Sequence, residues 1–511
     1  MFKIFSVLFL TLLVVSVNAA EKFSFLTVSE KARLLAAQPY QAPASIPRFM
    51  QELSYDQFQN IRFDPDKSLW RQHGSPFKVM LISTGLFYSH PVRINIIDSL
   101  GAHELAFQKN FFTFTDLDLE RRVPPDLGYA GFKLTYPLID PKVQSQFIVF
   151  AGASYFRGVG KDNAWGISSR GLALDTGLPS GEEFPSFIEY WLVQPASNAQ
   201  AMMVYALLDS PSVAGAYQFT IQPGQQTQVK VRVMLHPRKP LRLAGVAPLT
   251  SMFYYGENSA RPQGQWRHQV HDSDGLLIQN GNEEWLWRPL INPGSLEMDY
   301  FNTMSVKGFG LLQRHANFTD YQDLGARYDI RPSTWVKPDG NWGAGKVVLV
   351  QLPTPVESND NIVAFWTPDR PVLPQQTYDI RYTLAFGGPG LEQQPNGRTV
   401  NTLVGDGNIN GGGKVPGAYR IIVDFAGGNL VKLPASTRVE GVVTGLNQTE
   451  VLEEFIEYVP TLGYWRLSIL AKPAEDKALE LRAYLKSADQ TLTETWNYRL
   501  PPKNGILKVV D

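Results

Sequence analysis

Two segments of this 511-residue chain alternate largely between apolar and polar residues, and this alternation constrains the fold more than any other feature. In residues 228–235 every second side chain is apolar, with Lys230 and Arg232 between them. Residues 378–386 repeat the pattern, with charged residues such as Arg381 at the alternate positions. Because successive side chains of a strand point to opposite faces, each segment predicts a half-buried antiparallel strand.

Shorter apolar runs predict further strands, and helical periodicity is scarce. We expect strands at residues 347–352, 420–425, 465–470 and 479–485, most of them close to Pro or Gly. The segment 27–37, TVSEKARLLAA, combines capping residues with good helix formers and predicts one short N-terminal helix. The chain is therefore expected to be mainly β and built from packed sheets.

The first twenty residues have the pattern of a secretory signal peptide. Lys3 precedes an apolar run over residues 4–17, and the small residues Ala19 and Ala20 follow. The run is shorter than the roughly 20 residues that span a bilayer, so we expect cleavage and no membrane insertion afterwards. No Arg-Arg pair precedes the run, which favours Sec export over the twin-arginine route.

A Gly-rich stretch divides the remaining chain. Residues 387–413 contain nine Gly and two Pro among mostly polar residues, which predicts a linker region at residues 389–413. It would separate a large β-sandwich domain at residues 21–388 from a smaller domain at residues 414–511. The size and short strands of the smaller domain suggest an immunoglobulin-like β-sandwich.

Charge and composition exclude several function classes. The 47 Lys and Arg nearly balance the 48 Asp and Glu, so we expect no nucleic-acid partner. Cys is absent, which excludes disulfides and thiolate chemistry. Phosphate-cradle, nucleophile-elbow and H-E-x-x-H patterns are missing. His268 and His271 lack a nearby third ligand, so we expect neither a metal nor a cofactor.

Tryptophan is concentrated in one stretch of the chain. Six of the 11 Trp lie between residues 266 and 366, namely Trp266, Trp285, Trp287, Trp335, Trp342 and Trp366. Aromatic rings present an apolar face on which sugar rings stack, and Trp adds an N–H donor. Any single Trp is as well explained by core packing, but the cluster favours carbohydrate binding.

The same stretch carries acidic residues beside turn formers, in the strings HDSDG (271–275), RYDIRPSTW (327–335) and ESNDNIVAFW (357–366). Glycoside cleavage requires two carboxyl groups that flank one bond. An acidic residue in such a place often only caps a turn. Spacing alone does not choose a catalytic pair.

A series of strings gives a more specific indication. DLGYAGFKLTYPL (126–138), GASYFRGVG (152–160), RGLALDTGLPSGEEFPSF (170–187), HDSDG and NDNIVAFWTPD (359–369) occur in this order. Together with others they resemble the periplasmic glucan biosynthesis proteins of the OpgG and OpgD type over nearly the whole mature chain. HDSDG is similar to the OpgD type, whereas the signal peptide is similar to the OpgG type.

The resemblance implies a galactose-mutarotase-like β-sandwich, an immunoglobulin-like β-sandwich and a periplasmic location. It implies action on osmoregulated periplasmic glucans with a β-1,2-linked glucose backbone, as an inverting endo-β-1,2-glucanase without metal or cofactor. The family's proton donor corresponds to Asp360 and its base to Asp272. Glu357, Tyr328 and Asp274 match supporting positions in the cleft.

For substrate binding we expect two groups of side chains. The rings of Trp266, Trp285, Trp287, Trp335 and Trp342 would form sugar subsites, and Arg288, Arg327 and Arg331 would donate hydrogen bonds to hydroxyl groups. Two other functions use the same residues. One is a non-catalytic factor that presents glucan to inner-membrane synthesis machinery, and the other is a branching transglycosylase.

Overall fold

The computed structural model describes residues 23–434 and 437–502, and its architecture is mainly β, as the sequence predicts. The two alternating segments form β14 (Thr227–Pro237) and β25 (Tyr378–Gly387), which pair with each other as antiparallel neighbours. The four shorter predicted strands coincide with parts of β23, β27, β30 and β31. The predicted signal peptide, residues 1–20, lies outside the described residues.

The first of two large sheets contains ten strands within the described part of the chain. In spatial order they are β2 (Lys78–Ser83), β6 (Tyr129–Tyr136), β7 (Ser145–Ala151), β8 (Tyr155–Gly158), β9 (Ser168–Arg170), β15 (Ala244–Ser251), β24 (Ile362–Pro368), β23 (Gly345–Gln351) and β20 (Glu297–Thr303), with β10 (Leu172–Leu174) paired to β15.

The second sheet contains fifteen strands, again counted over the described residues. In spatial order they are β28 (Glu440–Leu446), β31 (Leu479–Ser487), β33 (Thr495–Leu500), β19 (Trp285–Pro289), β18 (Gly275–Gln279), β21 (Gly308–Leu312), β22 (Ser333–Pro338), β25, β14, β13 (Val213–Gln222), β12 (Met202–Asp209), β11 (Ser186–Val193), β3 (Arg93–Asp98) and β4 (Gly101–Glu104), with β32 (Gln490–Thr491) paired to β31.

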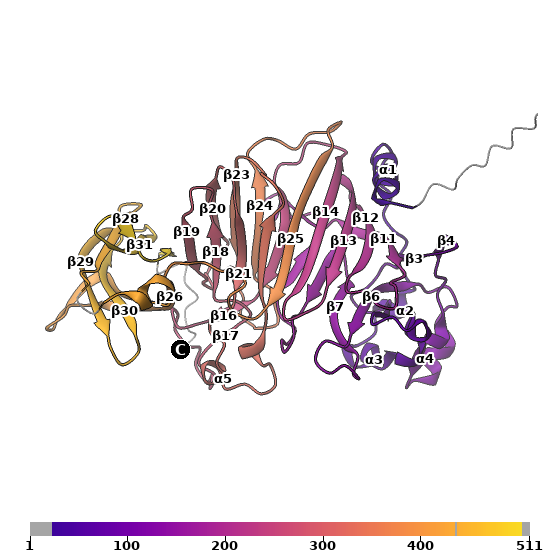
Figure 1. Cartoon of the computed structure of the whole chain (residues 1–511), viewed down its shortest axis with the longest axis horizontal. Coiled ribbons are helices and arrows are strands. Elements are labelled where there is room, and N and C mark those ends of the chain that lie inside the picture. Colours follow the sequence, from indigo (N-terminus) through magenta and orange to yellow (C-terminus); the bar gives the residue numbers. More distant parts are fainter. Residues whose placement is uncertain (1–22, 435–436, 503–511) are drawn as a thin grey trace, which may run out of the picture.

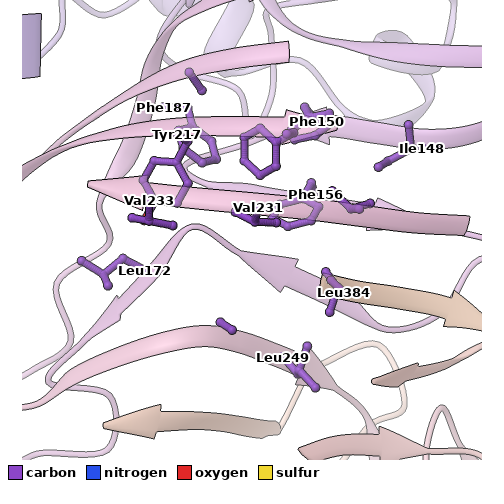
Figure 2. Packing of buried hydrophobic residues seen from close by; sticks show 14 of the residues in the cluster. Ile148, Phe150, Phe156, Leu172, Phe187, Tyr217, Val231, Val233, Leu249 and Leu384 are labelled. Carbon is purple, nitrogen blue, oxygen red and sulfur yellow. The ribbon is translucent and has the colours of Figure 1, made fainter. Parts of the chain in front are cut away.

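The main hydrophobic core lies between these two sheets. Phe150 and Phe156 of the first sheet face Tyr217 and Val231 of the second, and each of the four is at most 3% exposed (Figure 2). Burying side chains of this size contributes roughly 1.5–3 kcal/mol each. The sandwich of sheets is therefore the rigid support on which the site is built.

Helices cover only small parts of the molecule. The predicted N-terminal helix is α1 (Phe25–Ala36), and its residues Phe25, Val28 and Ala32 pack on Trp191 at the outer face of the second sheet. The other helices are short: α2 (Arg48–Gln51), α3 (Tyr55–Gln59), α4 (Leu117–Arg122) and α5 (Phe318–Tyr321). In Figure 1, α2, α3 and α4 gather at one end of the sandwich, and the C-terminal strands lie at the other.

The C-terminal unit differs from the sequence prediction at its start. Its four-stranded sheet consists of β26 (Arg398–Asn408), β27 (Lys414–Ala426), β30 (Tyr464–Lys472) and β29 (Glu450–Val459). β26 therefore occupies part of the range expected as a linker, 389–413. Gly407 allows close approach, since a Cβ there would lie 2.7 Å from the carbonyl oxygens of Val415 and Ala418. Residues 411–413 turn with positive φ between β26 and β27, as a hairpin needs.

The C-terminal unit is also joined to the large unit through the second sheet. Leu286 and Trp287 of β19 pair in parallel with Thr495 and Trp496 of β33. Apolar side chains from both units form one further core, which includes Trp285, Trp335, Leu467 and Trp496. The two units thus share a sheet and a core.

Two small sheets complete the fold. One pairs β1 (Ile61–Phe63) with β5 (Phe112–Phe114), and the other pairs β16 (Phe253–Tyr255) with β17 (Val270–His271). The second of these lies directly before HDSDG in the chain and positions the site described next.

Candidate active site

The segments that carry Asp272 and Asp360 are held against the same short piece of backbone. Asp272 follows β17, and its N–H donates to the carbonyl of Met252 over 2.8 Å. Asp360 precedes β24, and the adjacent Asn361 accepts the N–H of Phe253 at 2.8 Å and donates to the Phe253 carbonyl at 3.1 Å. The backbone segments that carry the two acids, 88 positions apart in the chain, therefore converge on residues 252–253. Asn361 is a positioning residue that the sequence analysis missed.

Asp272 is buried, with 5% of the residue exposed, and forms an ion pair with Arg331. Burial raises the pKa of Asp272 to about 6, although the charge and hydrogen bond of Arg331 oppose the rise. The negative charge of Asp360 adds to the increase. A carboxylate with this pKa can accept a proton near neutral pH.

Asp360 lies at the edge of an open cavity of about 520 Å³. Its side chain is 33% exposed, and the Arg157 Nη2 lies 3.5 Å from its Oδ2. Rings and polar side chains line the cavity, among them Tyr88, Lys133, Gln146, Tyr155 and Trp165. The sequence analysis missed these side chains; Tyr155 and Arg157 lie in the string GASYFRGVG, which had served only to establish the resemblance.

The cavity is connected to Asp272 through two arginines. Arg157 pairs with Asp360, and its charge also lowers the pKa of Asp272. Arg331 pairs with Asp272 and packs on Gly166, where a Cβ would lie 3.1 Å from the Arg331 Cβ. The loop that carries Trp165 therefore lies against Arg331, the ion-pair partner of the candidate base Asp272.

Tyr328 and Glu357 lie beside this pair but contact different groups. The buried Tyr328 ring lies 4.1 Å from the Arg331 guanidinium, and burial raises the pKa of its hydroxyl. Glu357 forms an ion pair with Arg267. Trp266, the neighbour of Arg267, is 59% exposed and leaves a ring face open to a ligand. Arg267 was not identified from the sequence.

Arg327 is directed away from the two acids. It adopts a left-handed backbone conformation with φ +46° and forms a two-bond ion pair with Asp329, both bonds at 2.9 Å. Its side chain is 39% exposed. It fixes the turn before Arg331.

Three of the predicted sugar-binding tryptophans lie in the shared core. Trp285 stacks on Trp335 at 5.9 Å, and the Arg314 guanidinium lies 3.6 Å from the Trp287 ring. The three tryptophans are only 4–7% exposed, so protein atoms cover their ring faces. Gly275 of HDSDG makes room for Trp287, because a Cβ there would lie 2.1 Å from the ring.

Arg288 and Trp342 also make contacts with other side chains of the fold. Arg288 is 3% exposed and donates to Asn497 and Asp299, each at 2.7 Å. Trp342 packs on Trp366 at 5.1 Å and precedes β23. Because β23 is antiparallel to β24, Trp342 lies at the end of the sheet opposite to Asp360.

Asp274 is connected to the C-terminal unit through His315 and Glu257. It accepts a hydrogen bond from His315 Nδ1 at 2.7 Å and from the N–H groups of Arg314 and His315 at 3.0 Å. The His315 ring also pairs with Glu257, whose carboxylate accepts the N–H of Thr402 in β26. Burial alone would raise the pKa of Asp274, but the bond and charge of His315 outweigh it and leave this pKa lowered.

The site residues offer no preformed metal centre. Over residues 23–434 and 437–502, no three His, Asp or Glu side chains are grouped so that they could hold a metal ion. Within the same ranges, no helix combines the length and apolarity needed to cross a bilayer.

Comparisons with known proteins relate the chain to one family. A family profile described as "Periplasmic glucan biosynthesis protein, MdoG" matches residues 23–500. The "Glucans biosynthesis protein G" of Ralstonia nicotianae is 43% identical over 492 residues, which cover 95% of this chain and 98% of that protein. A solved structure, the Slr1438 protein from Synechocystis sp. PCC 6803, covers 68% of this chain and 99% of its own at 10% identity, with a TM-score of 0.15 that carries no argument.

Proposed function

The chain belongs to the periplasmic glucan biosynthesis protein family, and from this premise we propose that it hydrolyses β-1,2-linked glucan with inversion at the anomeric carbon. One observation carries the proposal. Asp272 and Asn361, the neighbour of Asp360, both hydrogen-bond to residues 252–253, which brings one buried carboxyl group and one on a ring-lined cavity to the same part of the fold. An inverting glycosidase needs such a pair, one as acid and one as base.

The two carboxyl groups take different roles. Asp360, on the cavity, donates its proton to the oxygen of the glycosidic bond as that bond breaks. Asp272 accepts a proton from the water whose oxygen forms the new bond to the anomeric carbon, directly or through a relay of water and sugar hydroxyls. Its pKa of about 6 suits a general base, because the group is ionised near neutral pH and still holds a proton well.

Aromatic rings and hydrogen-bond donors around the pair account for sugar recognition. Tyr88, Tyr155 and Trp165 in the cavity, and the exposed Trp266, provide faces for stacking on glucose. Arg157, at the cavity edge, donates to hydroxyl groups. Because the polymer carries no charge, we expect binding to depend weakly on salt.

The direct test is turnover of linear β-1,2-glucan by the purified mature protein. Reducing ends report cleavage, and the anomer formed first, observed by NMR, reports inversion. Asp272→Asn and Asp360→Asn should each lower the rate by roughly 10²–10⁴-fold, the usual contribution of a general acid or base. Asp369→Asn is the matched control, because this exposed residue follows the far end of β24 and pairs with Lys346. Unchanged rates in both active-site variants contradict the assignment.

One observation favours a second function. Arg331 covers the buried Asp272 with an ion pair. A carboxylate held in this way suits a protein that binds glucan and presents it to inner-membrane synthesis machinery without cleaving it. Saturable glucan binding with no new reducing ends after long incubation supports this function. Products longer than the starting chains indicate a branching transglycosylase instead.

A further inference from the structure

A second and larger hollow lies where the large unit meets the C-terminal unit. Its volume is about 580 Å³. Loops that follow β16, β19 and β23 form one side, and β26, β27 and the end of β33 form the other. Neither the sequence analysis nor the proposed mechanism uses it.

The lining of this hollow suits an uncharged, hydroxyl-rich ligand. Tyr254 from the large unit and Tyr419 from the C-terminal unit contribute aromatic rings, and Asn258, Ser259 and Gln263 contribute amide and hydroxyl groups. No Lys or Arg occurs among the described residues that line it, and its one acidic side chain, Asp406, pairs with Lys414 at 2.7 Å. Rings combined with neutral polar groups are the means by which proteins bind sugars.

The first connection to the candidate active site is the loop between β16 and β17. Gln263 in this loop lines the hollow, and three residues later Trp266 exposes its ring. The next residue, Arg267, pairs with Glu357, and its carbonyl accepts the Tyr255 hydroxyl at 3.1 Å. The loop therefore runs from the hollow to the active-site arginines and acids.

The second connection is the loop between β23 and β24. Thr354 and Pro355 line the hollow, Glu357 pairs with Arg267, and Asp360 follows. Asp360 lies five positions after Pro355, so the two positions are at most about 18 Å apart. A glucan chain of a few sugar units can span this distance.

The wall of the hollow is fixed by hydrogen bonds. The Asn292 amide donates to the carbonyls of Tyr254 at 3.0 Å and Thr354 at 2.8 Å, and its oxygen accepts the Thr354 N–H at 2.9 Å. Both loops are thus joined at the hollow. A preformed site loses less conformational entropy when a ligand binds.

We propose that this hollow is a distal glucan subsite that holds the part of a long β-1,2-glucan chain remote from the bond being cleaved. The proposal rests on the proposed function, because the ligand is the same polymer. It assigns a role to the C-terminal unit, whose Tyr419 completes the subsite. It also predicts that the protein prefers long chains over short oligosaccharides.

The test compares long linear β-1,2-glucan with short oligosaccharides that fill only the catalytic cavity. Tyr254→Ala and Tyr419→Ala should each raise KM, or Kd where binding is measured, for the long chain about 2–10-fold, as expected from the loss of one ring. Values for the short oligosaccharides should stay within about twofold of the wild type. Tyr254→Phe and Tyr419→Phe should retain most of the long-chain affinity, because the ring remains.

Control variants distinguish a loss of glucan binding from a folding defect and from occupation of the hollow by another segment. Tyr458→Ala removes a 46% exposed tyrosine of β29 outside the hollow and should change neither substrate. The two Ala variants lie in different units, so a folding defect of one, seen by circular dichroism, leaves the other informative. A chain that ends at Pro502 tests whether residues 503–511 compete for the hollow.

The possible results are distinct. Equal long-chain affinity of wild type and both Ala variants overturns the subsite while the proposed function stands. Higher glucan affinity on removal of residues 503–511, with no effect of either Ala variant, also overturns it. A wild-type protein that neither binds nor cleaves β-1,2-glucan overturns the proposed function and the subsite together.

Discussion

Asp272 and Asp274 belong to the same five-residue string, yet the fold shifts the pKa values of their carboxyl groups in opposite directions. Burial raises the pKa of Asp272 to about 6, and the negative charge of Asp360 adds to the rise. Asp274 is also buried, but it accepts bonds from His315 and two backbone N–H groups, and its pKa is lowered. Burial alone raises the pKa of a carboxyl group, so the hydrogen-bond partners decide the sign.

The difference separates Asp272, the proposed general base, from Asp274, which belongs to the network that joins the two units. Asp274, His315 and Glu257 form a buried chain of charges that ends on the Thr402 N–H of the C-terminal unit. Burial lowers the pKa of His315, but its bonds to the two carboxylates outweigh this and raise it well above the usual value. Arg314 and Glu494 add a buried ion pair at 2.6 Å across the same boundary. These groups hold the two units together.

The largest expected effect is a difference in activity between variants of Asp272 and Asp274. Asp272→Asn should reduce glucan cleavage by roughly 10²–10⁴-fold, because the variant side chain cannot accept a proton. Asp274→Asn, measured on the folded fraction, should retain most of the wild-type rate. Initial rates at saturating glucan provide the comparison, and equal losses in both variants would show that the two acids do not differ in role.

The second effect is a loss of stability when Asp274 is substituted. Asp274→Asn should lower the free energy of unfolding by about 3–5 kcal/mol, because it leaves a buried imidazolium without its main partner. Chemical denaturation with matched m-values measures the loss. Asp369→Asn, at an exposed ion pair, should change stability by less than about 1 kcal/mol. A comparable small change for Asp274→Asn would contradict the assembly role.

The third effect is on the pH dependence of activity. Because Asp272 must be ionised to act as base, kcat/KM should fall about tenfold per unit as pH drops below about 6. Arg331→Gln removes the positive charge that opposes the rise in the pKa of Asp272. The fall in kcat/KM should therefore begin at higher pH in this variant. An unchanged profile in this variant would remove Arg331 from the control of Asp272.

Asp272 and Asp274 should also make opposite contributions to the pH dependence of stability. The folded state holds the Asp272 proton up to about pH 6 whereas the unfolded state releases it near 3.8, so this residue lowers stability as pH rises through that window. Asp274 stabilises the fold above its ordinary pKa, and this contribution is lost as pH falls through its lowered folded value. Unfolding curves of Asp272→Asn and Asp274→Asn between pH 3 and 7 measure both contributions.

The smallest effect compares an exposed and a buried tryptophan. Trp266→Ala should weaken glucan binding about 2–10-fold, because one stacking face is lost, and should leave stability unchanged. Trp285→Ala should instead lower stability by about 3–5 kcal/mol and leave the affinity of the folded protein unchanged. Glucan titrations and denaturation of both variants test the contrast, and a loss of affinity in Trp285→Ala alone would reverse it.

The sequence predicted the class of fold well, because alternation of apolar and polar residues is a local property. The segments at 228–235 and 378–386 became neighbouring strands, and residues 27–37 largely became α1. The Gly-rich stretch was harder to interpret. Gly407 serves close packing within the C-terminal sheet, and composition does not distinguish this use of glycine from flexibility.

The site was only partly predictable. Position in the sequence grouped the tryptophans, but Trp266 is exposed whereas Trp285, Trp287 and Trp335 lie in the core. The side of a strand or loop that faces the core is a matter of packing, and the spacing of tryptophans contains no information about it. The cavity rings, such as Tyr155, lie outside the stretch rich in tryptophan and had no local signal.

By itself the sequence determined a mainly β chain of balanced charge with no cysteine, and its strings indicated the family. Only the tertiary structure decided that the segments of Asp272 and Asp360 converge, that Asp274 belongs to the network that joins the two units and that three tryptophans are buried. The physical reason is that strand formation depends on neighbours along the chain. Proximity, burial and the pKa of a carboxyl group depend on residues brought from distant positions by the pairing of strands.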